Sequence, residues 1–217
     1  MKYDVMELFP TPLIMTKIEE NTDELKLSHK FTRNDNDQKY NHVKHKDGKR
    51  ILEDYPRIRD SLLEKFVAVA DEYLQYKNKE YIITTSWITH SQKGDKSTLH
   101  KHLNSFWSGV YYFQDNYPKL TAEILFNNPN QQLSSISFTT DDVRHLNNVN
   151  CGSLLIKPES KVLLLFPSYL YHRVMYQIID AERLSLAFNI MPITEWGGGD
   201  SYFNMDWVRR NNLDKVK

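Results

Sequence analysis

The sequence predicts a mainly β fold of the α+β class, a sandwich or barrel with one helix packed on a face. Two observations predict it. A stretch after Pro56 has apolar residues at helical spacing, and the chain that follows breaks into short segments rich in β-branched and aromatic residues. Seven or eight such segments after a single long helix are typical of a two-layered or closed β fold.

The helix is expected to begin at Pro56 and to end before Asn78. Proline has no amide hydrogen, which is harmless in or just before a first turn. Charged residues separate the apolar ones, so the helix is amphipathic and should cover one face of the β layer. The apolar positions recur at steps of three and four: Ile58, Leu62, Leu63, Phe66, Val67, Ala70, Tyr73 and Leu74.

Seven segments from residue 81 onward have the composition of strands. They are residues 81–89, 107–113, 122–126, 153–157, 162–166, 172–177 and 184–191. An earlier segment, residues 8–15, is interrupted by two prolines, as an edge strand can be. The length suits one hydrophobic core, so we expect a single domain of residues 1–217 with its β core at about residues 81–192.

Composition limits the classes of partner. Lys plus Arg equals Asp plus Glu at 28 each, so there is no strong nucleic-acid signal and no global attraction to an anionic membrane. No stretch approaches the roughly 18 apolar residues of a membrane span. The single cysteine, Cys151, excludes an internal disulfide and a thiolate metal cluster. We therefore expect a cytoplasmic protein.

Three histidines carry the strongest functional signal. His100 and His102 are one residue apart, and on an extended strand both side chains project to the same face. His172 follows a buried strand that ends in Phe166-Pro167. Because imidazoles are common metal ligands, this spacing predicts that the three bind one metal ion and leave its other face to substrates.

Arg183 is the second functional signal. It lies on the strand after His172, and Ser185 two positions later is expected on the same face. A guanidinium with a neighbouring hydroxyl suits bidentate binding of a carboxylate. The alternative is a surface ion pair with Asp180 or Glu182. Because burying an unpaired guanidinium is costly, an inward Arg183 predicts an acidic ligand.

Four blocks of sequence occur in order between Ser86 and Asn189. They are His-x-His, Ser-Gly-Val-Tyr-Tyr, Leu-Phe-Pro-Ser-x-Leu-x-His and Glu-Arg-x-Ser-x-x-Phe-Asn. Together and in this order they resemble a family of 2-oxoglutarate/Fe(II)-dependent oxygenases of marine bacteria and their phages, within the prolyl-hydroxylase-like superfamily. The resemblance implies a double-stranded β-helix, or jelly roll, and an enzyme with Fe(II) and 2-oxoglutarate as cofactors. A phage-encoded member would work in the host cytoplasm.

The resemblance also implies roles for individual residues. It assigns iron to His100, His102 and His172, and the 2-oxoglutarate carboxylate to Arg183 with help from Ser185. Further hydrogen bonds to this small-molecule cosubstrate would come from Tyr111 or Tyr112, which strand parity alone does not distinguish, and from Asn189. The implied reaction hydroxylates a primary substrate while 2-oxoglutarate is converted to succinate.

His102 departs from the superfamily, most of whose members have His-x-Asp at this motif. Either His102 replaces the carboxylate, or a carboxylate from elsewhere completes the site, with Asp95 and Glu123 the nearest candidates. A neutral third ligand would leave the iron site more positive by one charge.

Other interpretations of the pattern remain open. A non-enzymatic jelly-roll binding or structural protein would have incidental histidines, and a three-histidine enzyme of the cupin type would not need Arg183 as a clamp. The sequence does not specify the primary substrate, and a homodimer is compatible with it.

Three further features bear on the site. The aromatic residues Trp87, Phe106 and Trp107 are either walls of a substrate pocket or core residues. The polar connection at residues 129–150 is either a lid or disordered. His42 and His45 stand beside lysines, which disfavours a nearby cation, so we expect both to be surface residues.

Overall fold

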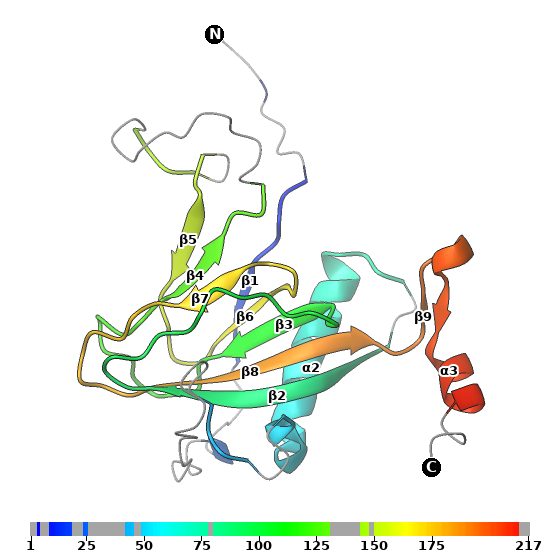
Figure 1. Cartoon of the computed structure of the whole chain (residues 1–217), viewed down its shortest axis with the longest axis horizontal. Coiled ribbons are helices and arrows are strands. Elements are labelled where there is room, and N and C mark those ends of the chain that lie inside the picture. Colours follow the sequence, from blue (N-terminus) through cyan, green and yellow to red (C-terminus); the bar gives the residue numbers. More distant parts are fainter. Residues whose placement is uncertain are drawn as a thin grey trace.

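The computed structural model describes residues 4, 9–18, 24–25, 42–45, 49–77, 80–130, 144–147 and 150–212. Strands dominate the described chain, which confirms the prediction of a mainly β protein (Figure 1). In chain order the elements are β1 (Ile14–Lys17), η1 (Ile51–Asp54), α2 (Pro56–Glu72), β2 (Tyr81–Ser91), β3 (Trp107–Tyr111), β4 (Ile124–Asn127), β5 (Ser153–Ile156), β6 (Val162–Pro167), β7 (His172–Val174), β8 (Arg183–Pro192), β9 (Glu195–Trp196), η4 (Gly199–Ser201), β10 (Phe203–Asn204) and α3 (Met205–Asn212).

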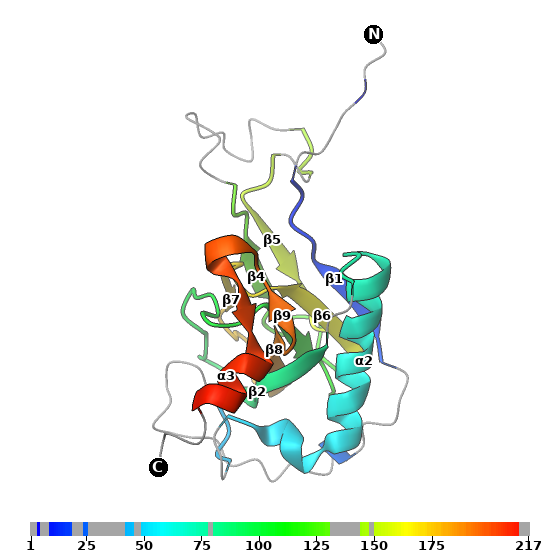
Figure 2. The same ribbon diagram turned by 90° about the vertical axis from the view of Figure 1, so that its right-hand side faces the viewer.

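The strands form two main antiparallel sheets. The larger has the order β1-β6-β3-β8-β2, and the smaller has the order β5-β4-β7. Helix α2 runs along the larger sheet (Figures 1 and 2). Each of the seven predicted strand segments contains one strand of these sheets, with ends that differ by a few residues.

The core has two layers because the central strands are buried on both faces. All six residues of β6 are buried, in keeping with its unbroken apolar sequence. One cluster of buried side chains joins α2 to the larger sheet and includes Phe66 and Phe188. A second cluster contains residues of both sheets, among them Phe126 and Ala187. Successive residues of β8 therefore face the helix and the smaller sheet in turn.

Helix α2 begins at Pro56, as predicted, and buries Ile58, Leu62, Phe66 and Ala70. It ends at Glu72, so the expected apolar stripe is longer than the helix itself. The end has a clear backbone cause, because Gln75 has a φ of 55°, a left-handed conformation that stops a helix. No helix in the described part of the chain is long and apolar enough to cross a membrane.

A small hairpin of β9 and β10 follows the larger sheet, and α3 continues from it (Figure 1). The rings of Trp196 and Phe203 stack across this hairpin, with centroids 4.4 Å apart.

Candidate metal centre and carboxylate site

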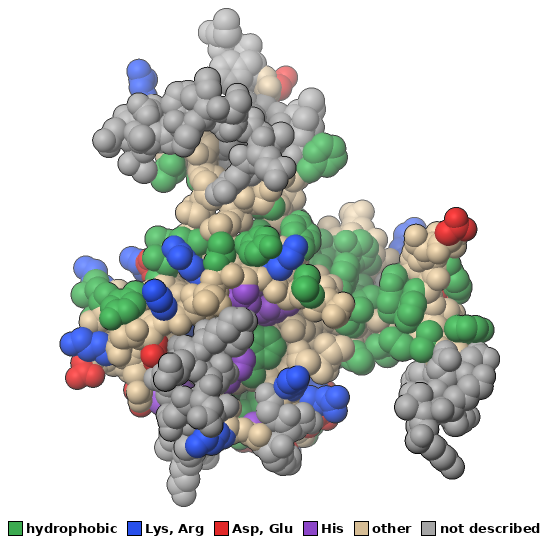
Figure 3. Space-filling view, viewed as in Figure 1, with side chains coloured by type: hydrophobic (Ala, Val, Ile, Leu, Met, Phe, Trp, Pro, Cys, Tyr) green, Lys and Arg blue, Asp and Glu red, His purple; other side chains and the backbone are tan. Residues whose placement is uncertain are grey.

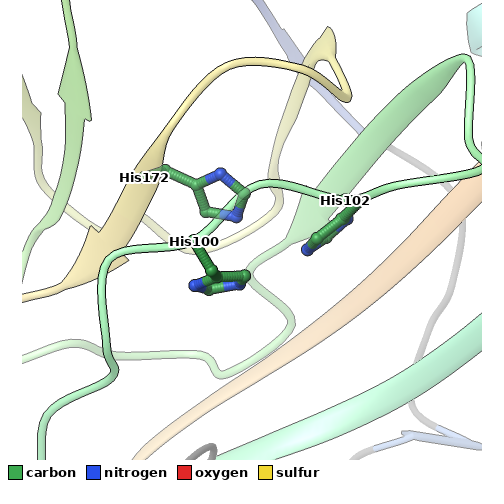
Figure 4. A group of neighbouring side chains, drawn as sticks. All are labelled: His100, His102 and His172. Atoms are coloured by element: carbon green, nitrogen blue, oxygen red, sulfur yellow. The ribbon is translucent and has the colours of Figure 1, made fainter.

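His100, His102 and His172 converge on one point (Figure 4). Each offers one ring nitrogen, and these nitrogens lie within 4.8 Å of one another. Nitrogen ligands about 2.0–2.2 Å from a metal are separated from one another by roughly 3 Å in an octahedral arrangement. The three nitrogens are therefore close enough together to be candidate ligands of one metal ion.

The backbone brings these histidines together in an unexpected way. The prediction that His100 and His102 lie on a strand is wrong, because β3 begins only at Trp107. Instead His100 forms an isolated bridge with His172, the first residue of β7, through N–H to O=C hydrogen bonds of 3.0 and 2.8 Å. The amide of His102 donates to the Ser168 carbonyl at 2.9 Å. Two segments far apart in sequence are thus fixed at the same place by backbone pairing.

The hydrogen bonds of the three rings fix which nitrogen can bind a metal. Nδ1 of His100 lies 2.7 Å from the Thr98 carbonyl, and Nδ1 of His172 lies 2.9 Å from the Leu170 carbonyl. Nδ1 of His102 lies 2.6 Å from Oδ1 of Asn189. All three partners are oxygen acceptors, so each Nδ1 carries the proton and each Nε2 carries the lone pair.

Burial keeps two of these rings neutral. Desolvation lowers the pKa of His172 to about 3 and that of His102 to about 4, and repulsion from the other histidines lowers both further. The hydrogen bonds that the rings donate to Leu170 and Asn189 raise the pKa values but have a smaller effect than burial. Neutral imidazoles are the form that ligates metals, so the two rings are ready to bind an ion near pH 7.

A network of side chains orients His102. Asn189 Oδ1 also accepts a hydrogen bond from Ser108 Oγ at 2.8 Å, and its Nδ2 donates to Thr85 Oγ1 at 2.9 Å. Ser108 Oγ lies 2.8 Å from Ser168 Oγ, and both serines are fully buried. Both amide atoms of Asn189 thus have protein partners, so the structure places this residue behind the metal centre. The predicted hydrogen bond from Asn189 to 2-oxoglutarate remains untested. The position of Asn189 disfavours it, because both amide atoms already have partners.

Arg183 lies at the start of β8 and is only 1% exposed. Its Nε donates to the Ala122 carbonyl at 3.0 Å, and its Nη1 donates to Ser185 Oγ at 3.0 Å. Its Nη2 donates to the hydroxyl of Tyr112 at 3.2 Å. The side chain is thus held in a single position inside the protein, with Ser185 on the same face as expected.

Each guanidinium nitrogen of Arg183 has a hydrogen-bond partner, but none of these three partners carries a charge. Burial raises the pKa of Tyr112, so this phenol stays neutral. The alternative of a surface ion pair with Asp180 or Glu182 is wrong, because Arg183 is buried and the Glu182 carboxylate lies 3.0 Å from His90 instead. Within the described residues, no ion pair joins Arg183 to a carboxylate.

The two tyrosines at the end of β3 have separate roles. Tyr111 belongs to the core cluster beneath α2. Tyr112 belongs to the cluster that joins the sheets and contacts Arg183 through both its hydroxyl and its ring, whose centroid is 5.3 Å from the guanidinium carbon. Only Tyr112 therefore reaches the expected cosubstrate site.

Neither carboxylate considered as a third ligand joins the cluster. Among the described residues, the group able to hold a metal consists of the three histidines alone. Asp95 accepts a hydrogen bond from the amide of Gln92 at 2.7 Å within a turn. Glu123 contributes its backbone carbonyl to Met175. The arrangement favours His102 as the third ligand.

Several neighbours of the site differ from expectation. The prediction of a surface position for His42 is wrong, because it is half-buried and its ring lies 5.6 Å from that of Trp87. Trp87 in turn lies 5.4 Å from the ring of His102, so it is a wall of the site. Trp107 is a buried core residue, and Phe106 lines a groove beside it. The proximity of His42 depends on a bridge to Thr89 that no local pattern reveals.

Two other expectations have simpler outcomes. His45 lies 3.1 Å from Asp54 and takes no part in the cluster. Most of the connection at residues 129–150, namely residues 131–143 and 148–149, lies outside the described residues.

Comparisons with solved structures show the same fold in 2-oxoglutarate-dependent enzymes. The non-heme α-ketoglutarate-dependent carbocyclase SnoK of nogalamycin biosynthesis has a TM-score of 0.58 at 9% identity, covering 88% of this chain and 84% of SnoK. HygX from Streptomyces hygroscopicus, solved with nickel, 2-oxoglutarate and hygromycin B, has a TM-score of 0.57 at 12% identity, covering 84% of each chain. A Pseudomonas putida prolyl-4-hydroxylase has a TM-score of 0.51 at 12% identity, covering 82% of this chain and 92% of that enzyme. No curated protein sequence matches.

The fold and the site thus define a 2-oxoglutarate-dependent oxygenase. Residues 85–189 match the family described as "Putative 2OG-Fe(II) oxygenase" and include all three histidines and Arg183. The matched stretch runs from β2 to β8, so the β core of the chain is similar to that of 2OG-Fe(II) oxygenases.

Proposed function

We propose that this enzyme hydroxylates its primary substrate at a three-histidine iron centre. The Nε2 atoms of His100, His102 and His172 would hold Fe(II). Arg183, with Ser185 and Tyr112, would hold the carboxylate of 2-oxoglutarate that is remote from the metal. When bound, Fe(II) and 2-oxoglutarate would let O2 act as the oxidant, with one oxygen atom going to the substrate and the other to succinate, and with CO2 released.

The buried, uncompensated charge of Arg183 is the observation that carries this proposal. A guanidinium removed from water without a counter-charge is costly, and neutral acceptors offset only part of that cost. A dicarboxylate ligand would supply the missing charge through charge-assisted hydrogen bonds. A metal enzyme that did not use a carboxylate cosubstrate, such as the cupin-type alternative, would have no need of this residue.

The sequence of β8 supports a path between the clamp and the metal centre. Arg183, Ser185, Ala187 and Asn189 alternate with core residues and so share the inner face of the strand. Asn189 touches His102 at one end, and Arg183 lies at the other. The two positions between them carry small side chains, which leave room for a short dicarboxylate.

The chain's own residues would prepare the site before any cofactor arrives. The Nδ1 partners orient three neutral rings, so metal binding requires no proton release from His102 or His172 near pH 7. Trp87 shields one side of His102 and would limit water there.

We further propose that the two sheets close as a double-stranded β-helix and that residues 1–217 form one domain.

The test is an anaerobic titration of the protein with Fe(II) and then with 2-oxoglutarate, followed by the weak visible charge-transfer band of the chelate. His172→Ala should lower iron affinity by more than about tenfold, since loss of even an indirect metal-site contact costs that much. His45→Ala is the matched control, because His45 lies outside the cluster. Iron binding that survives replacement of all three clustered histidines would refute the proposal.

A further inference from the structure

A groove with a volume of about 860 Å³ lies beside the metal centre. His102 forms part of its wall, as does the segment that follows His102. The end of α2 and the turn after β6 form the other walls. Aromatic and apolar side chains dominate the lining, and they include Tyr73, Tyr76, Leu103, Phe106 and Tyr169.

We infer that this groove binds the primary substrate, and that the substrate is a polypeptide segment with apolar or aromatic side chains and an acidic residue nearby. The inference rests on the proposed function, because it takes the three histidines as the reacting centre.

The apolar surface extends beyond the groove, which argues for a macromolecular substrate. Leu103 is 73% exposed, and Tyr169 is 54% exposed. Outside the groove, Leu99 and Tyr171 remain 45% and 46% exposed on the two segments that carry the histidines. Figure 3 shows hydrophobic side chains around the histidines on this face. Contiguous exposed apolar surface marks an interaction site, and a small metabolite within the groove would leave this rim uncovered.

The composition of the groove matches the core of a protein interface. Such cores are rich in aromatic residues and poor in charged ones, and tyrosines often contribute most of the binding energy. Lys101 is the one cation among the described residues that line the groove, and its Nζ lies 5.1 Å from the ring centroid of Tyr171. A nucleic-acid strand would need several such cations for its phosphates, whereas one acidic side chain needs only one.

Hydrogen bonds tie the groove wall to the metal centre. The amide of Phe106 donates to the Ile190 carbonyl at 3.0 Å, and the amide of Ser168 donates to the Phe106 carbonyl at 3.1 Å. Ser105 lines the groove, and its Oγ lies 2.9 Å from Ser168 Oγ. Ser168 in turn contacts Ser108, and Ser108 contacts the ring of His102. A segment bound in the groove would therefore lie at a fixed position relative to the iron ligand.

The test uses short fluorescein-labelled Gly/Ser peptides that contain Phe and Glu, Phe and Lys, or Ala and Glu. Their binding to the full chain loaded with Ni(II) and 2-oxoglutarate is measured by fluorescence anisotropy. The Phe/Glu peptide should bind most tightly, and Leu103→Ser should weaken it by about tenfold, equal to about 1.4 kcal/mol. Leu154→Ser is the matched control, because Leu154 is an equally apolar, exposed residue of β5 that does not line the groove.

Charge reversal gives an internal comparison. Lys101→Glu should make the Phe/Lys peptide bind more tightly than the Phe/Glu peptide, and this ranking on one variant does not depend on its stability. Equal affinity of the three peptides, no binding, or insensitivity to Leu103→Ser would overturn the inference.

Two other probes identify a different ligand class. Leu103-dependent binding of a labelled oligothymidylate, or of anilinonaphthalene sulfonate alone, would overturn the inference in favour of nucleic acid or a small aromatic anion. The affinity for 2-oxoglutarate is measured on the same samples. Loss of the peptide result with 2-oxoglutarate binding intact would leave the proposed function standing, whereas failure of 2-oxoglutarate binding would remove it.

Discussion

The metal centre and the carboxylate clamp lie at opposite ends of the inner face of β8, and they differ in electrostatics. At the metal end, two of the three imidazoles are held neutral by burial, and acceptors fix the tautomer of all three. At the other end, Arg183 keeps a full positive charge among neutral partners. One end offers lone pairs to a cation, and the other offers a fixed cation to an anion.

This difference shows how one strand can serve two ligands. The metal end depends on orientation, because a neutral ring binds only if its Nε2 faces the ion. The clamp end depends first on charge, because the guanidinium attracts a carboxylate, and bidentate hydrogen bonds add to that attraction. Substitutions should therefore affect the two ends independently, as variants of each can test.

The largest effect is expected for Arg183→Ala. The affinity for 2-oxoglutarate should fall by about 2–4 kcal/mol, because a confined carboxylate would lose its buried partner. Arg183→Lys keeps the charge but loses the bidentate geometry, so it should fall between the parent and the alanine variant. Isothermal titration with 2-oxoglutarate measures both. Fe(II) affinity should not change, and a parallel loss of iron would mean that the two ends are not independent.

Asn189→Ala should affect the other end. Without its acceptor, the ring of His102 can rotate or change tautomer, so metal affinity should fall by about ten- to a hundredfold, as for other outer partners of metal ligands. Co(II) binding followed by its visible absorption reports affinity and ligand geometry together. Asn128→Ala is the matched control, since the Asn128 amide donates to the Cys151 carbonyl away from the cluster. A normal cobalt spectrum in Asn189→Ala would show that Asn189 is not needed to orient His102.

Local pattern predicted much of this fold. The β-branched segments and the period after Pro56 depend on neighbours in sequence, so they identified α2 and the seven strands from β2 to β8. The parity of β8 placed Arg183 and Ser185 on one face for the same reason. The observed end of α2 differs from the predicted one because the helix stops before Gln75, which has a left-handed backbone conformation.

Long-range pairing explains what the sequence did not predict. Asn189 reaches His102 across 87 positions, and His42 comes near the site through a bridge to Thr89. The segment of His100 and His102 looked like a strand, yet its order comes from a bridge to His172 and from Ser168. Such contacts depend on how the sheets are assembled, and no spacing within one segment records them.

Acid should destabilise the metal end selectively. In the unfolded chain the imidazoles of His102 and His172 take up a proton near pH 6.5, whereas in the folded protein they do so only near pH 4 and pH 3. Because the unfolded state binds more protons in this window, stability is fully present above pH 6.5 and is lost as the pH falls. Between pH 7 and pH 5 the metal-free protein should lose about 1–2 kcal/mol for each of these histidines.

Urea unfolding of the metal-free protein at the two pH values measures this loss. His172→Asn should reduce the difference between them, because it removes one of the two buried imidazoles. An unchanged pH dependence in His172→Asn would show that the buried imidazole is not its source.

The smallest effect is expected for Tyr112→Phe, which changes the clamp without changing its charge. The substitution keeps the ring beside the guanidinium but removes the hydroxyl that accepts from Nη2. In the absence of 2-oxoglutarate this leaves a buried donor unsatisfied, so the free energy of unfolding should fall by about 1 kcal/mol. Tyr111→Phe is the matched control for ligand binding, because Tyr111 lies in the other core cluster and this substitution should leave 2-oxoglutarate affinity unchanged.

Bound 2-oxoglutarate could satisfy the vacated donor, in which case the ligand should stabilise Tyr112→Phe at least as much as the parent in thermal unfolding. If the hydroxyl instead holds the ligand directly, 2-oxoglutarate should stabilise the variant less. The sign of that difference decides whether Tyr112 mainly holds Arg183 in place or binds the carboxylate itself.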